Sequence, residues 1–284
     1  MERLQAHRAF FADFITASAG VLKTDGRLAA AFVSTPREQF LGPGPWKIFV
    51  GGGYVETPSD DPAFLYQDVI VAIAPERRIN NGQPVLHAIC LASLDVKLGE
   101  VVTHVGAGSG YYSAVLANLV GPNGSLTALE VEPDLAAMAK SNLSSFSNVT
   151  VHHRSDSEGL LPECDAIYVN AGATAPLDVW LDALRVNGRL LFPLTPDGSG
   201  GSPGAGAMLL VTRTSIDRFD ARFVCAAMFI PCVGARDEQT ALQLAEAFGR
   251  GDLGNVRSLR RNTPSDDTCW FAGNGWWLSI ASES

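Results

Sequence analysis

The chain has 284 residues, a length that suits one large domain or one domain with appendages. Its 21 basic and 30 acidic side chains give a formal net charge of -9, which argues against nucleic acid as a partner, because phosphate backbones attract basic proteins. Five cysteines without a CxxC pair favour reduced, buried thiols and no metal site. The N-terminus offers no apolar run of secretory or membrane-spanning length, so we expect a cytoplasmic protein that binds no membrane.

Residues 1–83 are expected to form a cap of helices and loops. Apolar side chains recur at helical spacing through residues 1–40, with an interruption at Thr35-Pro36. Residues 41–75 are rich in Gly and Pro and end in the apolar run DVIVAIAP, which predicts a loop with short strands of the kind that often covers a site. Helical periodicity returns at residues 84–95.

The stretch VVTHVGAGSG, residues 101–110, predicts a buried strand that ends in a glycine loop. The next segment, YYSAVLANLV, has apolar side chains at helical spacing and ends before Gly121-Pro122. Strand, loop and helix therefore follow one another. Glycine lets a backbone approach a ligand where a Cβ would clash, so this loop is a candidate ligand site.

Strands and helices then alternate. The predicted strands are residues 125–132, 149–156, 164–172 and 189–194, and the predicted helices are residues 133–145 and 176–188. This order predicts an α/β fold with a doubly wound, mainly parallel sheet and right-handed crossovers. Ligands of such sheets bind at the carboxyl ends of the strands.

Beyond residue 194 the pattern changes. Residues 195–207 are almost wholly Gly, Pro, Ser and Ala, which predicts a long connection between two antiparallel strands, and another strand is expected within residues 222–234. The final part should begin with an amphipathic helix. We expect three parts in all: a cap, residues 1–83; a core, residues 84–234; and a C-terminal extension, residues 235–284.

Two further groups stand in the extension. The first is an aromatic group that could form a wall for a peptide or a partner, or pack as core or subunit interface: Trp270, Phe271, Trp276 and Trp277. The second is a basic group that could meet an acidic peptide or form a solvated face: Arg257, Arg260 and Arg261.

The glycine spacing indicates which ligand to expect. A dinucleotide loop has the pattern G-x-G-x-x-G, but its last glycine would fall at Tyr111, and the pattern here is G-x-G-x-G. This favours a nucleoside cofactor without phosphate, S-adenosylmethionine. Glu130 ends the next strand, where a carboxylate can accept the ribose hydroxyl hydrogens, and Asp156 follows the third, where it could meet the adenine amine. The alternative is a tight turn with two solvated acids.

Several motifs together resemble one family. QPVLHAICLASLDVKLGEVVTHVGAGSGYYSAVLANLVG, LTALEVEPDLAAMAKSNL, CDAIYVNAGA, VNGRLLFPL and FIPCVG are similar, in this order, to the protein-L-isoaspartate O-methyltransferase family of class I methyltransferases. The resemblance implies a Rossmann-like class I fold and S-adenosylmethionine as cofactor. It implies that these residues bind the cofactor: Pro84, His87, Gly106, Ala107, Gly108, Ser109, Gly110, Glu130, Val131, Asp156 and Ser157. For His87, an ordinary helix position is the alternative.

The chain departs from the family in one loop. Where the family has Thr-Ile-Ser, implicated in handling the isoaspartyl carboxylate, this chain has Asn80-Asn81-Gly82. Gly82 takes the serine position, and Asn80 could donate a hydrogen bond in place of the threonine, although Asn-Asn-Gly is also an ordinary turn signal. We take Asn80 and Gly82 as the candidate catalytic positions. Tyr66, Asp68 and Asn81 are candidate substrate-binding residues, with packing and capping as the alternative for the first two.

These expectations combine into a function. The chain should be a methyltransferase that uses S-adenosylmethionine to esterify a carboxylate of an aspartyl or isoaspartyl residue in a protein or peptide. A carboxylate is already ionised at neutral pH and needs no general base. One alternative is a small-molecule hydroxyl or carboxyl acceptor, and another is a cofactor-binding adaptor with weakened catalysis. The sequence is also compatible with a homo-oligomer.

Overall fold

The computed structural model describes residues 2–20, 26–155, 159–196 and 204–282. It divides into two compact units: unit 1 is Met1–Glu100 with Ala107–His153, and unit 2 is Val101–Gly106 with Arg154–Ser284. Each unit is described by itself below. The division into a cap, a core and a C-terminal extension stays a prediction, since compactness groups the chain in another way.

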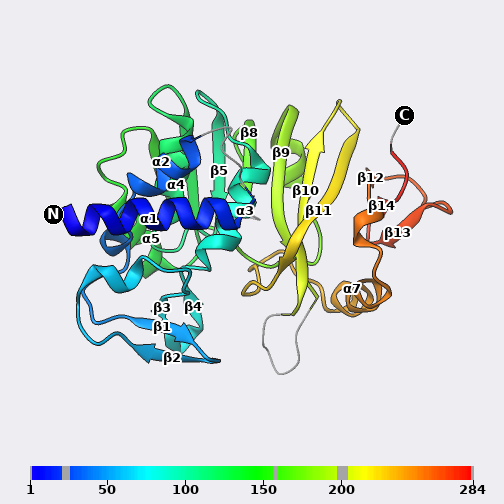
Figure 1. The fold of residues 1–284 in the computed structure, drawn as a ribbon. Coiled ribbons are helices and arrows are strands. Elements are labelled where there is room, and N and C mark those ends of the chain that lie inside the picture. The colour runs from blue at the N-terminus through cyan, green and yellow to red at the C-terminus, as the bar shows by residue number, and fades with distance from the viewer. Residues whose placement is uncertain (1, 21–25, 156–158, 197–203, 283–284) are drawn as a thin grey trace. The chain divides into compact units, whose positions relative to one another are not determined.

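The N-terminal helices of unit 1 confirm the helical prediction for residues 1–40. They are α1 (Glu2–Ser18), α2 (Arg27–Val33) and the 3-10 helix η1 (Arg37–Phe40). Helix α1 packs on α2 and on α3 (Pro84–Leu94), and α2 packs on α4 (Tyr111–Val120) (Figure 1). Phe11 and Phe32 meet edge to face with ring centroids 6.4 Å apart, so aromatic contacts fill this helical layer.

A buried arginine organises the same layer. Arg37 is fully buried, and its guanidinium donates hydrogen bonds to the carbonyls of Leu65 at 2.7 Å, Gln67 at 2.9 Å and Val69 at 3.1 Å. It also lies over the ring of Phe11, 5.2 Å from the centroid. A buried guanidinium is costly unless its donors are satisfied, so these three bonds offset part of that cost and fix the path of residues 65–69. In the described part of the chain, Arg37 Nε is buried without a hydrogen-bond partner.

The Gly- and Pro-rich segment forms short strands, as predicted. Strands β1 (Lys47–Val50) and β2 (Gly53–Glu56) make an antiparallel hairpin, and β3 (Ala72–Ala74) pairs with β4 (Ile79–Asn80). The 3-10 helices η2 (Pro62–Leu65) and η3 (Pro75–Arg77) lie between them. A small core of Trp46, Leu65 and Val71 holds the segment together.

The remaining elements of unit 1 follow the predicted alternation. Strands β6 (Ser125–Glu130) and β7 (Val149–His153) pair in parallel, and α5 (Pro133–Asn142) connects them. Pro133 is the first residue of α5, where its fixed φ suits a helix and its missing N–H costs nothing. The carboxyl end of β6 is therefore followed at once by a helix N-terminus.

Unit 2 contains a mixed sheet whose strand order is β13-β14-β12-β11-β10-β9-β8-β5. Strand β8 (Cys164–Val169) pairs in parallel with β5 (Val101–Val105) and with β9 (Leu184–Leu194). Strands β9, β10 (Gly206–Arg213) and β11 (Phe219–Ala227) are antiparallel neighbours, the long adjacent strands of Figure 1. The α/β class and its parallel core strands are thus confirmed, and the sheet continues with antiparallel strands.

The predicted helix 176–188 is wrong in its C-terminal half. Helix α6 spans only Asp178–Ala183, and β9 begins at Leu184. Leu184 is buried and pairs with Cys164, and Asn187 has a φ of 67°, which an α-helix does not accommodate. Pairing with β8 therefore overrides the helical pattern of this segment.

The C-terminal extension adds strands that the sequence pattern did not predict. After α7 (Glu238–Arg250) and η5 (Leu253–Asn255) come β12 (Ser258–Arg261), β13 (Cys269–Ala272) and β14 (Trp276–Ser279). The aromatic group predicted as a wall or as core is buried: Trp270, Phe271, Trp276 and Trp277. These rings pack inside unit 2, so the packing alternative is confirmed.

The basic group of the extension makes contacts within unit 2. Arg261 pairs with Asp178 and Asp182, both at 2.7 Å, and Arg260 pairs with Asp266 at 3.2 Å. Arg257 donates to the carbonyl of Gly254.

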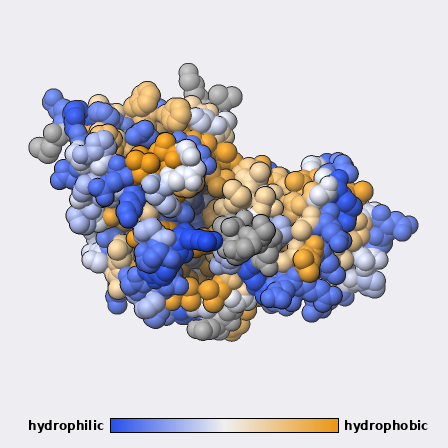
Figure 2. Space-filling model, turned by 90° about the horizontal axis from the view of Figure 1, so that it is seen from below, coloured by the Kyte–Doolittle hydropathy of each residue, from blue (hydrophilic) through white to orange (hydrophobic). Residues whose placement is uncertain are grey.

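Within the described ranges, no helix has the length and apolar character needed to cross a membrane. The same ranges hold no group of three or more His, Cys, Asp or Glu side chains placed to bind a metal ion. The face in Figure 2 is mostly blue with separate orange apolar patches. It is the face that carries the β1–β2 hairpin, which lies at the lower edge of unit 1 in Figure 1.

Candidate cofactor and acceptor site

The glycine loop has a backbone that only glycine adopts easily. Gly106, Gly108 and Gly110 have φ values of 72°, 56° and 95°, in the left-handed region where a Cβ is strained. The loop follows β5, and α4 begins at Tyr111 directly after it. The three alternating glycines are therefore a conformational requirement of this strand-to-helix connection.

The surroundings of the three glycines separate their roles. A Cβ at Gly110 would lie 3.0 Å from Leu143 Cδ1, so this glycine lets α5 pack closely. A Cβ at Gly106 would make ordinary contact with Asn170 at 3.5 Å. Among the residues that the structure describes, a Cβ at Gly108 would meet only Ile73 Cδ1, at 3.9 Å. The loop backbone at Gly108 therefore borders open space, as a ligand cradle requires.

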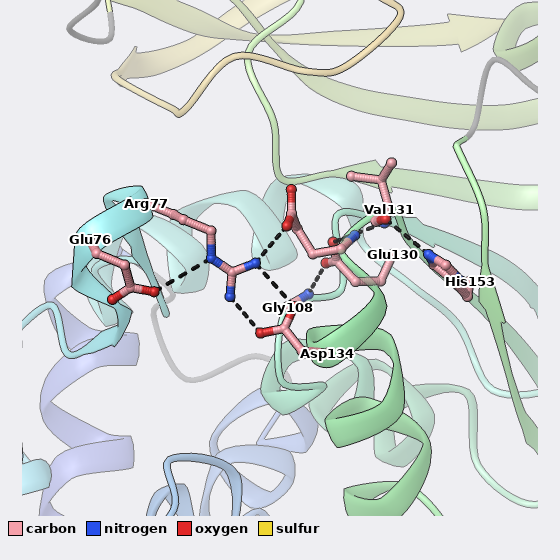
Figure 3. Close-up of polar contacts among 8 residues, drawn as sticks. Glu76, Arg77, Gly108, Glu130, Val131, Asp134 and His153 are labelled. Atoms are coloured by element: carbon pink, nitrogen blue, oxygen red, sulfur yellow. Dashed lines mark hydrogen bonds and ion pairs between the residues drawn. The ribbon is translucent and has the colours of Figure 1, made fainter.

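Glu130, at the end of β6, is bonded to this loop. Its Oε2 accepts from the backbone N–H of Gly108 at 2.6 Å, and its Oε1 accepts from the N–H groups of Val131 at 2.9 Å and Glu132 at 3.0 Å (Figure 3). Burial raises the pKa of this carboxyl above its ordinary value, against the three bonds, which lower it. Because Oε2 takes a single bond from the described residues, it keeps acceptor capacity for a ligand hydroxyl.

The other predicted cofactor residues of the loop act through their backbones. Ala107 donates its N–H to Leu129 at 3.0 Å, and the carbonyl of Ser109 accepts from Asn142 Nδ2 at 2.9 Å. The carbonyl of Val131 contacts His153 Nε2 at 3.1 Å (Figure 3). These bonds hold the loop and the end of β6 in place. Asp156 and Ser157 lie outside the described residues.

An arginine that the sequence reasoning missed lies beside the acid. Arg77, in η3, pairs with Glu132 and with Asp134, both at 2.5 Å (Figure 3). The hydrogen bond with Asp134 raises the pKa of Arg77, and the same bond lowers the pKa of Asp134. Arg77 thereby ties the chain segment that leads into Asn80 to the segment that follows Glu130.

The Asn-Asn-Gly loop forms a turn stabilised by its own side chains. Asn80 Oδ1 accepts from the N–H of Gly82 at 2.9 Å, an Asx-turn, and Gly82 has a φ of 72°. Asn81 is buried and exchanges bonds with Val71, its N–H donating at 3.0 Å and its Oδ1 accepting at 2.8 Å. Among the residues that the structure describes, Asn81 Nδ2 is buried without a hydrogen-bond partner. The turn alternative thus describes the conformation of this loop.

The imidazole of His87 fills the space beside Gly82. A Cβ at position 82 would lie 2.1 Å from His87 Nε2, far inside any allowed contact. The ring stacks on Tyr112, with centroids 3.6 Å apart and an interplanar angle of 13°. Pro84, the first residue of α3, follows this turn. Position 82 therefore has room for glycine alone while His87 keeps this position.

Tyr66 and Asp68 make contacts typical of packing and capping. The hydroxyl of Tyr66 donates to Glu38 Oε2 at 2.5 Å and accepts from Arg8 Nε at 2.8 Å, and burial raises its pKa. Asp68 accepts from the N–H of Val85 at 2.8 Å, in the first turn of α3. A substrate role for either residue stays a prediction.

The fold and the site together define a class. A parallel strand leads into a G-x-G-x-G loop, open space borders the middle glycine, and that glycine bonds an acid at the end of the next strand along the chain. The residues fit a ribose-containing ligand that has no phosphate to neutralise. This is the arrangement of a class I, S-adenosylmethionine-dependent methyltransferase.

Comparison with known proteins gives the family. Residues 15–237 match the model of protein-L-isoaspartate(D-aspartate) O-methyltransferase, so the chain belongs to this family. It is 29% identical to the protein-L-isoaspartate O-methyltransferase of Methanothermobacter thermautotrophicus, over 76% of this chain and 90% of that one. It is 32% identical to protein-L-isoaspartate O-methyltransferase 2 of Marinobacter nauticus, over 74% of this chain and 86% of that one.

Solved structures agree on the fold. A protein-L-isoaspartate O-methyltransferase superimposes with a TM-score of 0.63 and 20% identity, covering 84% of this chain and 68% of that one. A Plasmodium falciparum protein, described as a candidate member of the same family and bound to S-adenosyl-L-homocysteine, superimposes with a TM-score of 0.58 and 18% identity, covering 79% and 97%. These likenesses support the fold alone, and the sequence match carries the family.

Proposed function

We propose that this methyltransferase esterifies a carboxylate of an isoaspartyl or aspartyl residue in a protein or peptide, and that it acts in the cytoplasm. The observation that carries the proposal is the bond between Gly108 and Glu130 beside open space, within a chain of this family. Its partners are polypeptide substrates. The proposal also requires that Asn80, Asn81 and Gly82 form the acceptor side of the site.

The cofactor side of the site can bind and orient a nucleoside ligand. The backbone at Gly108 lets such a ligand approach closely, and Glu130 Oε2 can accept a hydrogen bond from a ribose hydroxyl. S-adenosylmethionine, when bound, supplies an electrophilic methyl group attached to a positively charged sulfur. The buried carboxylate of Glu130 would also place negative charge beside the ribose of the bound cofactor.

The acceptor side needs alignment more than acid–base chemistry. An acceptor carboxyl has a pKa of about 4, so it is ionised at neutral pH and no residue has to remove a proton. The Asx-turn of Asn80 and the buried ring of His87 fix the loop, and Arg77 ties its approach to the segment after Glu130. Positioning of this kind and exclusion of water supply much of the rate enhancement of such transfers.

The test uses labelled S-adenosylmethionine with an isoaspartyl peptide, the matching aspartyl peptide and a panel of small hydroxy and carboxylic acids. The proposal expects base-labile methyl ester on a peptide, and its loss in Glu130→Ala. Gly42→Ala is a control outside the site, because Gly42 has a φ of 70° and no atom of the described residues lies within 4 Å of its Cβ position. Transfer confined to the small molecules, or to none of the acceptors, would refute the proposed substrate.

A further inference from the structure

The β1–β2 hairpin carries an exposed aromatic pair, Phe49 and Tyr54. The two residues lie directly opposite each other across the hairpin, and their rings meet edge to face with centroids 5.4 Å apart. Phe49 is 42% exposed and Tyr54 is 37% exposed. Val50 and Val55 are also exposed, but they lie on the opposite face of the hairpin, since side chains alternate along a strand. Aromatic rings paired across a hairpin offer large contact area at low entropy cost, which is typical of a recognition surface.

Val71 connects the hairpin to the proposed acceptor loop. Ile48 of β1 forms an antiparallel bridge with Val71, and Val71 accepts from the N–H of Asn81 at 3.0 Å and donates its own N–H to Asn81 Oδ1 at 2.8 Å. The hairpin is therefore joined to the turn on which the acceptor carboxylate is proposed to lie. A polypeptide held there by one side chain must extend across neighbouring surface.

The backbone of β2 is free to pair. In the described part of the chain, β1 is the one strand that pairs with β2. The other edge of β1 is already occupied, because the N–H of Phe49 donates to the carbonyl of Ile70 at 2.8 Å. The outer edge of β2 is thus an edge strand beside apolar side chains. Such edges bind extended peptides by adding a strand, with backbone bonds for affinity and side-chain contacts for specificity.

We propose that the hairpin binds the stretch of substrate polypeptide that flanks the methylated residue. The flanking stretch pairs in extended form with β2 and places an apolar or aromatic side chain on Phe49 and Tyr54. The occupant is a peptide, because an edge strand recognises a backbone, which a small-molecule acceptor lacks. This inference rests on the proposed function and deepens it: the enzyme prefers isoaspartyl sites in extended segments with apolar neighbours.

The chain offers a matched control for exposed aromatic surface. Phe10 and Phe14 on α1 also stack, with centroids 6.4 Å apart, and are 71% and 47% exposed. They lie on a helix, whose backbone groups are already paired, so they offer an apolar patch without an edge strand. Replacing Phe10 removes exposed aromatic area but no part of the proposed peptide site.

The experiment compares two substrates. One is a peptide of about ten residues with apolar residues on both sides of a central isoaspartate, and the other is a blocked isoaspartyl tripeptide of small residues, too short to follow a strand of this length. For Tyr54→Ala and Phe49→Ala we expect KM for the long peptide to rise roughly tenfold, the effect of losing one aromatic contact. The short peptide's KM and the calorimetric affinity for S-adenosylhomocysteine should not change. Phe10→Ala should behave as wild type with both substrates.

Tyr54→Phe separates the ring of Tyr54 from its hydroxyl. It keeps the aromatic surface, so we expect an unchanged KM for the long peptide. Equal effects of Tyr54→Ala on the two peptides would overturn the inference, because the hairpin would then act only through the loop. Sedimentation showing that the alanine variants dissociate a dimer would also overturn it, since the occupant would be a second copy. Failure of the proposed function is distinguishable, because wild type would then methylate neither peptide.

Discussion

The contact between Gly82 and His87 leads to a sharp prediction about Gly82→Ala. The new Cβ would lie 2.1 Å from His87 Nε2 and 2.8 Å from its Cδ2, so the imidazole has to move. The ring is buried and stacked on Tyr112, so moving it disrupts this stack. Gly42→Ala is the matched control, because Gly42 has a φ of 70° against 72° for Gly82 and, within the described ranges, no atom within 4 Å of its Cβ position.

Both substitutions lower the free energy of unfolding through backbone strain, and only Gly82→Ala adds a steric clash. An alanine in the left-handed region costs about 1 kcal/mol or slightly more at either site. Gly82→Ala adds overpacking in a buried site and the lost ring contact, together about 2 kcal/mol. We therefore expect the free energy of unfolding, measured in urea, to fall by about 1 kcal/mol for Gly42→Ala and about 3 kcal/mol for Gly82→Ala.

A double-mutant cycle isolates the contact itself. In a His87→Ala background the space beside residue 82 is free, so Gly82→Ala should cost only the backbone strain of about 1 kcal/mol. The coupling free energy between the two positions should then be about 2 kcal/mol. Equal costs of Gly82→Ala in the two backgrounds would refute the claim that position 82 and the imidazole compete for one space.

The remaining predictions for the cofactor side concern the glycines and the acid. Gly108→Ala should weaken S-adenosylhomocysteine binding tenfold or more in calorimetry, whereas Gly110→Ala, with its Cβ 3.0 Å from Leu143, should mainly lower the free energy of unfolding; the reverse pattern would contradict the assigned roles. Because burial raises the pKa of Glu130 and the ribose hydroxyls need its ionised form, acidification should weaken binding at a higher pH than for an ordinary glutamate. Calorimetry from pH 7 to pH 4 measures this, and Glu130→Gln should remove the dependence.

The elements that could be predicted from the sequence are those whose signals lie within one short stretch of the chain. The strand, glycine loop and helix of residues 101–120 could be predicted because the apolar runs and the left-handed glycines occur within one short stretch. The same holds for β6 and α5, where Pro133 marks the start of the helix. The helix prediction was wrong for the C-terminal half of residues 176–188. The pairing of Leu184 with Cys164, twenty positions earlier in the chain, makes this part the start of β9.

The site residues that could be predicted are likewise those with a local sequence signal. The glycine loop and Glu130 follow from spacing, and the bond between them is in the structure. Arg77 was missed because its partner Glu132 is 55 positions away, and no local pattern links the two. Gly82 was recognised as a departure from the family, but its reason depends on the rotamer of His87, which only the folded chain fixes.

His104, on β5, gives a last prediction, for stability against pH. Its Nε2 lies 2.8 Å from Asn170 Nδ2, an amide that donates, so the ring is neutral, and burial lowers its pKa to about 3. The unfolded chain binds a proton at this residue below about pH 6.5, and the folded chain does so only near pH 3. Stability therefore falls as pH drops through this window.

The loss that His104 causes should be about 2.5 kcal/mol between pH 7 and pH 4.5, from one proton bound on unfolding. Urea unfolding of wild type and His104→Gln at both pH values measures it, with the exposed His152→Gln as the control. The difference in stability between wild type and His104→Gln should shrink or reverse on acidification, because the variant has no proton to bind at this position. A difference that stays constant across the two pH values would mean that His104 binds its proton over the same pH range in the folded and the unfolded chain, and the bond with Asn170 would then have to be reassigned.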